Sequence, residues 1–142
     1  MNAAVAGVVR FFEDLTPESL PNLHHIYDEQ ARFKDPFNEV TGLAAIEAIF
    51  AHMYVALEAP HFVVTQTIVQ GHHCMLTWEF RFRFKRFKPG QDQVILGASH
   101  LVFSEQGRIT VHRDYWDAAE ELYEKLPVVG SAMRWLKRQA SR

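Results

Sequence analysis

The sequence is poor in the residues that several common kinds of site require. It has one cysteine, Cys74, among 142 residues, which excludes an internal disulfide and a zinc site built on cysteines. Its net charge is −2, whereas a nucleic-acid-binding domain usually carries an excess of basic residues. No apolar run approaches the roughly 20 residues that span a bilayer. These absences predict a protein that binds no nucleic acid and has no membrane span.

Motifs for cofactors and metals are also missing. The sequence has no glycine-rich phosphate loop, no dinucleotide-binding fingerprint and no nucleophile elbow. The adjacent pairs His24–His25 and His72–His73 lack the spacing of a metal site, because neighbours on a strand point to opposite faces. The N-terminal segment has no basic region and meets charged residues too early for a signal peptide. We therefore predict a cytoplasmic protein without a metal or cofactor.

The hydrophobic pattern changes from a helical period to a strand period along the chain. Hydrophobic residues make up 48% of the sequence, which supports a single domain over residues 1–142. Spacings of three and four, with proline and glycine punctuation, predict helices at 3–14, 17–27 and 43–57 and a short strand at 31–34. Alternation then predicts strands at 61–70, 72–85, 93–104 and 108–116, followed by helices at 117–126 and from 127 onward. Helices segregated from an antiparallel meander define an α+β fold.

The stretch WEFRFRFKRFK, residues 78–88, combines aromatic and basic residues in the manner of a nucleic-acid-binding surface. Side chains of a strand alternate between its two faces, so the aromatic and basic side chains separate. Trp78, Phe80, Phe82 and Phe84 share one face, and Glu79, Arg81, Arg83 and Lys85 share the other. A stacking platform for nucleic acid needs both kinds of side chain on one surface. The pattern instead predicts an aromatic core or pocket wall with a charged outer face.

Three stretches carry a resemblance to a known superfamily: residues 26–50 with Asp35-Pro36 and Gly42, residues 98–110, and residues 112–138. They resemble the nuclear transport factor 2 superfamily, in its ketosteroid isomerase-like and SnoaL-like polyketide cyclase branch. The resemblance implies a cone in which a strongly curved antiparallel sheet wraps around N-terminal helices, with an extra C-terminal helix. It also implies a deep pocket inside the cone.

The same resemblance implies a catalytic aspartate. Asp35 matches the general base of the ketosteroid isomerases, which need an aspartate, a tyrosine and a protonated aspartate. The matching first helix has Phe11 and Phe12 and no tyrosine, and Ser99 stands where the protonated aspartate would be. Both departures argue against plain steroid isomerase activity.

In the family's register the last strand directs His112, Asp114 and Trp116 into the pocket. Asp114 then resembles the acid/base aspartate of the SnoaL-like cyclases, with His112 assisting it. The predicted substrate-binding residues are Trp78, Phe80, Ser99, Trp116, Tyr54 and Tyr27, the two tyrosines being placed on helices over the cone. Structural roles stay open for each: Asp35 as a turn cap, Asp114 as a hydrogen-bond acceptor, His112 as a core histidine.

Three functions follow from these observations. The first is a cofactor-free isomerase or cyclase that binds a small lipophilic carbonyl compound in an apolar pocket. The alternative is a non-catalytic ligand-binding or protein-association module, and the third is an epoxide hydrolase, for which Arg32 has no matching position.

The resemblance also implies a homodimer, formed through the outer face of the sheet. The amphipathic tail around Met133, Trp135 and Leu136 is expected to cover the pocket or the partner subunit.

Overall fold

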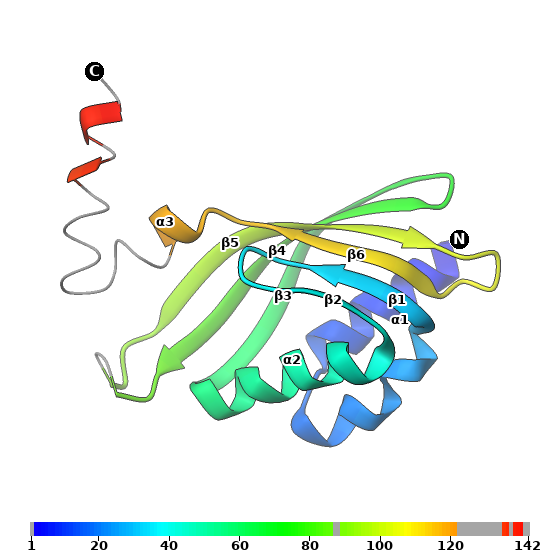
Figure 1. Ribbon diagram of the computed structural model, residues 1–142, viewed down its shortest axis with the longest axis horizontal. Coiled ribbons are helices and arrows are strands. Elements are labelled where there is room, and N and C mark those ends of the chain that lie inside the picture. Colours follow the sequence, from blue (N-terminus) through cyan, green and yellow to red (C-terminus); the bar gives the residue numbers. More distant parts are fainter. Residues whose placement is uncertain (1, 87–88, 122–134, 137, 141–142) are drawn as a thin grey trace.

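A computed structural model describes residues 2–86, 89–121, 135–136 and 138–140 of the protein. These residues form an α+β fold with one curved, unclosed sheet of six strands, and the N-terminal helices lie against one side of that sheet (Figure 1). The predicted fold class is confirmed. None of the helices in the described part of the chain is long and apolar enough to cross a membrane.

Most helices precede the four-strand meander along the chain, as the hydrophobic pattern predicted. The helices are α1 (Asn2–Glu13), the 3-10 helix η1 (Pro17–His25), α2 (Leu43–Ala56) and α3 (Ala118–Glu121). The strands are β1 (Tyr27–Lys34), β2 (Glu39–Thr41), β3 (Leu57–Gln70), β4 (His73–Phe84), β5 (Gln93–Phe103) and β6 (Ile109–Tyr115). Their order in the sheet is β2-β1-β6-β5-β4-β3, and β3 to β6 form the predicted antiparallel meander. The parallel pairing of β1 with β6 was not predicted, and it sets the end of β1 beside the end of β6.

Strand β4 separates its aromatic and basic side chains as predicted. Trp78 and Phe82 are buried, whereas Arg81 between them is exposed. Cys74 lies on the same inner face as Trp78 and is fully buried, as a small hydrophobic residue. The inner face of the sheet packs against α1, where Phe12 contacts the rings of Phe62 and Tyr27. The side chains on the inner face of the sheet are therefore part of the hydrophobic core.

The predicted helix at 17–27 is wrong in type and in its end. Pro17 begins a tight 3-10 helix that ends at His25, because Pro21 has no N–H to donate to an α-helical bond. Tyr27 is the first residue of β1 and does not lie on a helix. Tyr27 and Ala31 lie on the same face of β1 and are buried, whereas Glu29 between them on that face is exposed, in the segment where the pairing of β1 with β6 shifts between Tyr27 and Arg32.

Strand β3 begins earlier than the alternation predicted. Pro60 was expected to end the preceding helix, but it lies inside β3 and is buried. Because β3 is the edge of the sheet, a residue without an N–H is tolerated there. Ala59 before it has φ 51° at an irregularity of the β3–β4 pairing, which bends the strand around the helices.

Of the predicted tail, α3 is described over Ala118–Glu121. The rest of the segment predicted as helix at 117–126, and Met133, lie outside the described residues. Trp135 and Leu136 are helical, with 53% and 52% of their surface exposed. Their predicted role in covering the pocket or a partner stays a prediction.

Candidate functional site

A cavity of about 450 Å³ lies between α2 and the inner face of the sheet. Its walls are mostly aromatic and aliphatic side chains from β1, β3, β4, β5 and α2: Phe33, Phe62, Trp78, Phe80, Phe82, Phe84, Ile95, Ile49, Phe50, Met53, Ala56 and Leu57. Phe37 and Trp116 complete the aromatic lining, with their ring centroids 5.5 Å apart. This size and apolar character are typical of a small-molecule site.

The polar groups of the cavity are few, and the charged ones are acidic. Asp35, Asn38, His52 and Asp114 are its polar lining residues, and no lysine or arginine among the described residues lines it. Asp35 follows β1 and Asp114 lies on β6, so the parallel pairing of these strands brings the two carboxylates to one wall. In the described chain no group of three or more histidine, cysteine, aspartate or glutamate residues is placed to hold a metal ion.

The carboxylate of Asp114 is held through one of its two oxygens. Oδ1 accepts a hydrogen bond from the Ser99 hydroxyl at 2.5 Å and lies 2.6 Å from Nε2 of His112. Oδ2 accepts no hydrogen bond from any described residue. The Asp114 side chain is 16% exposed, so its charge stands in a largely dry environment. One oxygen fixes the orientation of the carboxylate, and the other is free to meet a ligand.

His112 links Asp114 to the core behind it. A carboxylate cannot donate, so Nε2 of His112 carries the proton of that bond. In the neutral imidazole Nδ1 is then an acceptor, and it takes the bond from the Tyr27 hydroxyl at 2.5 Å. His112 is 4% exposed and Tyr27 is 1% exposed. The chain Tyr27–His112–Asp114 therefore runs from the core to the cavity wall, with a donor and an acceptor at each contact.

Burial raises the pKa of Tyr27 well above its usual value, and the negative charge of Asp114 raises it further. The phenol consequently keeps its proton at neutral pH and remains a hydrogen-bond donor. Phe12 packs edge-on against both rings, with centroids 6.4 Å from Tyr27 and 5.7 Å from His112. This packing fixes the plane of the imidazole, and with it the direction of the bond to Asp114.

Ser99 receives its own bond from Trp78, whose indole N–H donates to the serine hydroxyl at 2.8 Å. Gly97 makes this arrangement possible, because it pairs with Trp78 across β4 and β5 and the indole ring lies over it. A Cβ atom at Gly97 would lie 2.7 Å from two carbons of that ring, which is too close for any real contact. A glycine in β5 thus positions the ring that positions Ser99.

Asp35 has a different environment from that of Asp114. Its Oδ1 accepts bonds from the backbone N–H groups of Phe37 and Asn38 at 2.8 and 2.6 Å, and the Asn38 side chain contacts both oxygens at 3.1 and 3.2 Å. The carboxylate caps the turn that joins β1 to β2, which was the structural alternative for this residue. It also lines the cavity. Whether Asp35 acts as a base stays a prediction.

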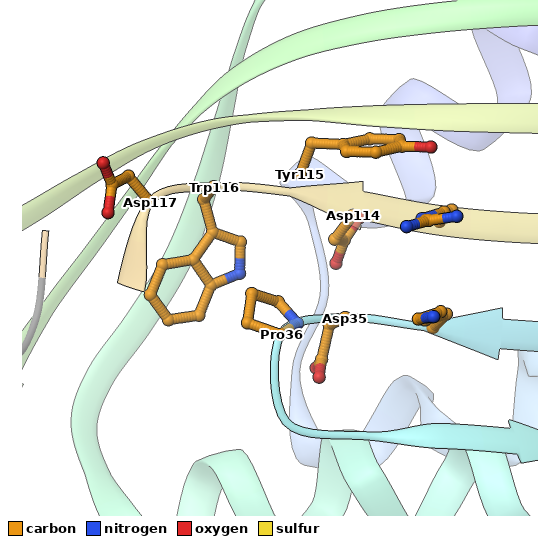
Figure 2. A pocket seen from close by; sticks show the side chains of 8 residues that line it. Asp35, Pro36, Asp114, Tyr115, Trp116 and Asp117 are labelled. Atoms are coloured by element: carbon orange, nitrogen blue, oxygen red, sulfur yellow. The ribbon is translucent and has the colours of Figure 1, made fainter. Parts of the chain in front are cut away.

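A second, more open hollow of about 530 Å³ lies at the ends of β1 and β6. Figure 2 shows its labelled residues, with Asp114 and Trp116 on one side of β6 and Tyr115 on the other. Asp35, Asp114 and Trp116 line both this hollow and the apolar cavity. Lys34 and Arg113, which are paired in register, lie on the outer side only. Asp35 and Asp114 therefore each border both the apolar cavity and the open hollow.

The other predicted site residues fall into three groups: those that line the cavity, those that line a small void next to it, and those that line neither space. Trp78, Phe80 and Trp116 line the 450 Å³ cavity. Ser99 and His112 do not; they line a void of about 20 Å³ next to it, together with Asp114 and Trp78. Tyr27 and Tyr54 line neither space. Tyr54 lies on α2 as predicted, and its buried hydroxyl has no hydrogen-bond partner among the described residues.

Several wall residues were missed in the sequence. Phe50, Met53 and Leu57 belong to the spacing of three and four that predicted the helix at 43–57, and none of them was predicted to line a cavity. Phe62 lies in an alternating strand and gave no signal that its ring would stack on Phe80, with centroids 4.7 Å apart. Gly97 lies inside a predicted strand, where an isolated glycine indicates close approach of another group. That signal was present and was not used.

A comparison with protein-family models identifies the chain. The model of the SnoaL-like domain matches residues 8–112, which is most of the sequence. The protein belongs to the SnoaL-like domain family. The match ends at His112, so the family assignment covers the cone and leaves Asp114 and Trp116 outside the matched segment.

Solved structures show the same fold at low sequence identity. A protein from Catenulispora acidiphila with a ketosteroid isomerase-like fold, in complex with trimethylamine, has a TM-score of 0.69 at 18% identity, over 84% of this chain and 88% of its own. An LEH-like epoxide hydrolase of M. tuberculosis has a TM-score of 0.67 at 13% identity, over 87% and 86%. TerC, co-crystallised with polyporic acid, has a TM-score of 0.70 at 15% identity, over 83% and 92%.

These neighbours have NTF2-like folds, which confirms the resemblance drawn from the sequence. At such identities they establish the fold and leave the activity open. The search of curated proteins gave no match.

Proposed function

We propose that the protein is a cofactor-free acid/base enzyme, an isomerase or cyclase that acts on a lipophilic carbonyl compound. Asp114 is the catalytic base, and Oδ2 is the atom that removes a proton from the carbon next to the carbonyl group. The single observation that carries this proposal is the asymmetry of the Asp114 carboxylate at the cavity wall: Oδ1 is held by Ser99 and His112, and Oδ2 accepts no hydrogen bond from any described residue.

The arrangement satisfies the physical requirements of a general base. The group must lie within reach of the substrate in a site that is dry enough to give it a useful pKa. Asp114 lines an apolar cavity and is oriented by two donors, one of which is itself fixed by Tyr27. His112 and Ser99 contact Asp114 and not the cavity, so we assign them as positioning residues.

Asp35 is the second carboxylate of the same wall. Its four hydrogen-bond contacts to the turn occupy both oxygens and fix the carboxylate in place, whereas Oδ2 of Asp114 accepts no hydrogen bond from any described residue. We therefore propose that Asp35 shapes the cavity entrance and contributes negative charge, with proton transfer assigned to Asp114. Trp78, Phe80 and Trp116 are proposed to hold the apolar body of the substrate.

Two structural neighbours are in keeping with small-molecule chemistry in this fold. TerC was co-crystallised with polyporic acid, and the M. tuberculosis neighbour is an LEH-like epoxide hydrolase. No arginine among the described residues lines the cavity of this chain, and Arg32 is exposed on β1. An epoxide hydrolase with an Asp–Arg–Asp set is thus less well supported than a base-catalysed reaction on a carbonyl compound.

The experiment that tests the proposal uses 2-tetralone, a bicyclic ketone with acidic α-hydrogens. Exchange of these hydrogens in D₂O is followed by proton NMR with the full-length protein, with Asp114→Asn and with Asp35→Asn. We expect Asp114→Asn to lose at least about 100-fold of the protein-dependent rate, as for removal of a general base, and Asp35→Asn to lose much less.

Two outcomes would contradict the proposal. If Asp35→Asn abolishes exchange and Asp114→Asn does not, the base has been assigned to the wrong residue. If the wild-type protein binds 2-tetralone without accelerating exchange, the protein is a ligand-binding module, which is the alternative function.

We also propose a homodimer formed through the outer face of the sheet. Apolar side chains of that face are exposed on adjacent strands: Ile68, Met75, Val94, Leu96 and Tyr115. Leu96 is 57% exposed and lies opposite Glu79 in the β4–β5 register, so the apolar patch borders the charged row predicted from the sequence. A monomer rarely leaves such a patch uncovered, which supports burial against a second copy.

A further inference from the structure

The charge of the apolar cavity has one sign. Asp35 and Asp114 are its acidic residues, and the titratable His52 at its α2 wall is the only other ionisable lining residue in the described chain. Neither carboxylate forms an ion pair with a lysine or arginine among the described residues: Asp114 is bound by Ser99 and His112, and Asp35 by the turn at Asn38. In a space walled by hydrocarbon, two such charges act over several ångströms with little screening.

The aromatic walls of the cavity also favour a positively charged ligand. The faces of aromatic rings carry partial negative charge and attract cations, and tryptophan does so most strongly. Trp78 lies on β4 and Trp116 directly follows β6, and phenylalanines from β1, α2, β3, β4 and the turn after β1 complete the lining. A box of aromatic rings with carboxylates at one wall is the arrangement that binds organic ammonium groups.

We propose that the ligand of this cavity is a lipophilic amine, bound with its ammonium group against Asp114 and Asp35 and its apolar body among the aromatic rings. This inference rests on the proposed site and names the chemical class of its ligand. The same charges repel a carboxylate or phenolate, so anionic polyphenols are disfavoured. For the proposed reaction, the substrate is a carbonyl compound that also carries a basic nitrogen.

The volume of the cavity limits the size of the amine. About 450 Å³ accommodates a fused two- or three-ring skeleton and lies in the usual range for small-molecule sites. Lys34 and Arg113 lie in the adjoining hollow and do not line the cavity, so a ligand inside the cavity contacts the carboxylates and neither of these cations. The ligand therefore meets a negative, aromatic interior.

Three compounds with one ring skeleton test the inference: 2-aminotetralin, 2-tetralol and tetralin-2-carboxylate. Their affinities for the full-length protein are measured by isothermal titration calorimetry at neutral pH, where the amine is protonated and the acid is ionised. We expect the amine to bind at least about 10-fold more tightly than the alcohol, and the alcohol at least about 10-fold more tightly than the acid. Equal affinities, or preference for the alcohol or the acid, would overturn the inference.

Variants separate the charge effect from the shape of the cavity. Asp114→Asn should reduce the preference for the amine over the alcohol several-fold. Asp117→Asn is the matched control, because Asp117 is a nearby carboxylate that lines the outer hollow and not the cavity. An amine preference that persists in Asp114→Asn and disappears in Asp117→Asn would place the ammonium group outside the cavity and contradict the inference.

The binding experiment and the exchange experiment fail independently. If the amine binds in an Asp114-dependent manner but 2-tetralone exchange is not accelerated, the ligand class stands and the proposed reaction is wrong. If exchange depends on Asp114 but the amine has no advantage over the alcohol, the reaction stands and the ligand class is wrong.

Discussion

The hydroxyl oxygen of Tyr27 lies 2.5 Å from Nδ1 of His112, a residue 85 positions further along the chain. Since Tyr27 can donate to Nδ1, this buried contact supports the tautomer in which Nε2 of His112 carries the proton that faces Asp114. The first strand of the sheet thereby orients a carboxylate on the last strand. The parallel pairing of β1 with β6 is what brings the two residues together.

Replacing Tyr27 with phenylalanine tests this role. We expect Tyr27→Phe to leave Nδ1 of His112 without its donor, so that the proton no longer resides on Nε2 alone. Nitrogen-15 NMR of the imidazole reports the tautomer directly, and one fixed Nε2–H form is expected in the wild type. The buried unpaired nitrogen should also reduce the free energy of unfolding by about 1–3 kcal/mol. An unchanged tautomer in Tyr27→Phe would show that Asp114 alone orients the ring.

The raised pKa of Tyr27 predicts a loss of stability in alkaline solution. The folded protein keeps the Tyr27 proton at a pH at which the unfolded chain has released it, near the ordinary tyrosine pKa of about 10. The group contributes no pH dependence below that value. Above it, the free energy of unfolding falls with pH by up to about 1.4 kcal/mol per pH unit.

Urea unfolding of the wild type and of Tyr27→Phe, compared between about pH 8 and pH 11, isolates this contribution. The wild type should lose stability more steeply above about pH 10 than the variant does. Parallel curves for the two proteins would mean that Tyr27 titrates normally in the folded state.

Gly97→Ala tests the support beneath Trp78. The added methyl group would overlap the indole ring, so the ring must move and its bond to Ser99 must break. We expect a loss of about 1–3 kcal/mol in the free energy of unfolding and a large shift of the Trp78 indole N–H resonance. Gly7→Ala is the matched control, because a Cβ atom there meets nothing within 4 Å and alanine favours a helix. Equal effects of the two substitutions would contradict the proposed contact.

Leu96→Lys tests the proposed dimer. A charge at the centre of the exposed apolar patch should weaken self-association at least about 10-fold, which is about 1.4 kcal/mol. Sedimentation velocity over a range of protein concentrations measures this change. Val55→Lys on α2 is the control, since Val55 is 69% exposed and lies away from the outer sheet face. A wild-type protein that remains monomeric at all concentrations would contradict the proposal without any variant.

The fold could be predicted from the sequence because its signals are local. Alternation in β4 separates Trp78 from Arg81 without any tertiary information, and spacings of three and four define α2. The 3-10 helix and the early start of β1 could not be predicted in the same way. The first depends on Pro21 inside a helical pattern, and the second lies beside a register shift of the β1–β6 pairing, where exposed Glu29 breaks the alternation between buried Tyr27 and Ala31.

The site was predictable residue by residue but not as a network. The two aspartates and His112 were found through the resemblance, and their strands carry them to one region of the fold. The contacts of Asp114 with Ser99 and of His112 with Tyr27 join residues 15 and 85 positions apart, and no periodicity encodes such pairs. Tyr27 was assigned to a helix over the cone, whereas it is buried behind the histidine.

The most direct test of the account is a crystal structure of the full-length protein with 2-tetralone bound. The account predicts the ketone in the aromatic cavity, with its α-carbon about 3–3.5 Å from Oδ2 of Asp114 and with Oδ1 still bound by Ser99 and His112. A ketone bound elsewhere, or one held in the cavity with Oδ2 turned away from its α-carbon, would contradict the assignment of Asp114 as the base.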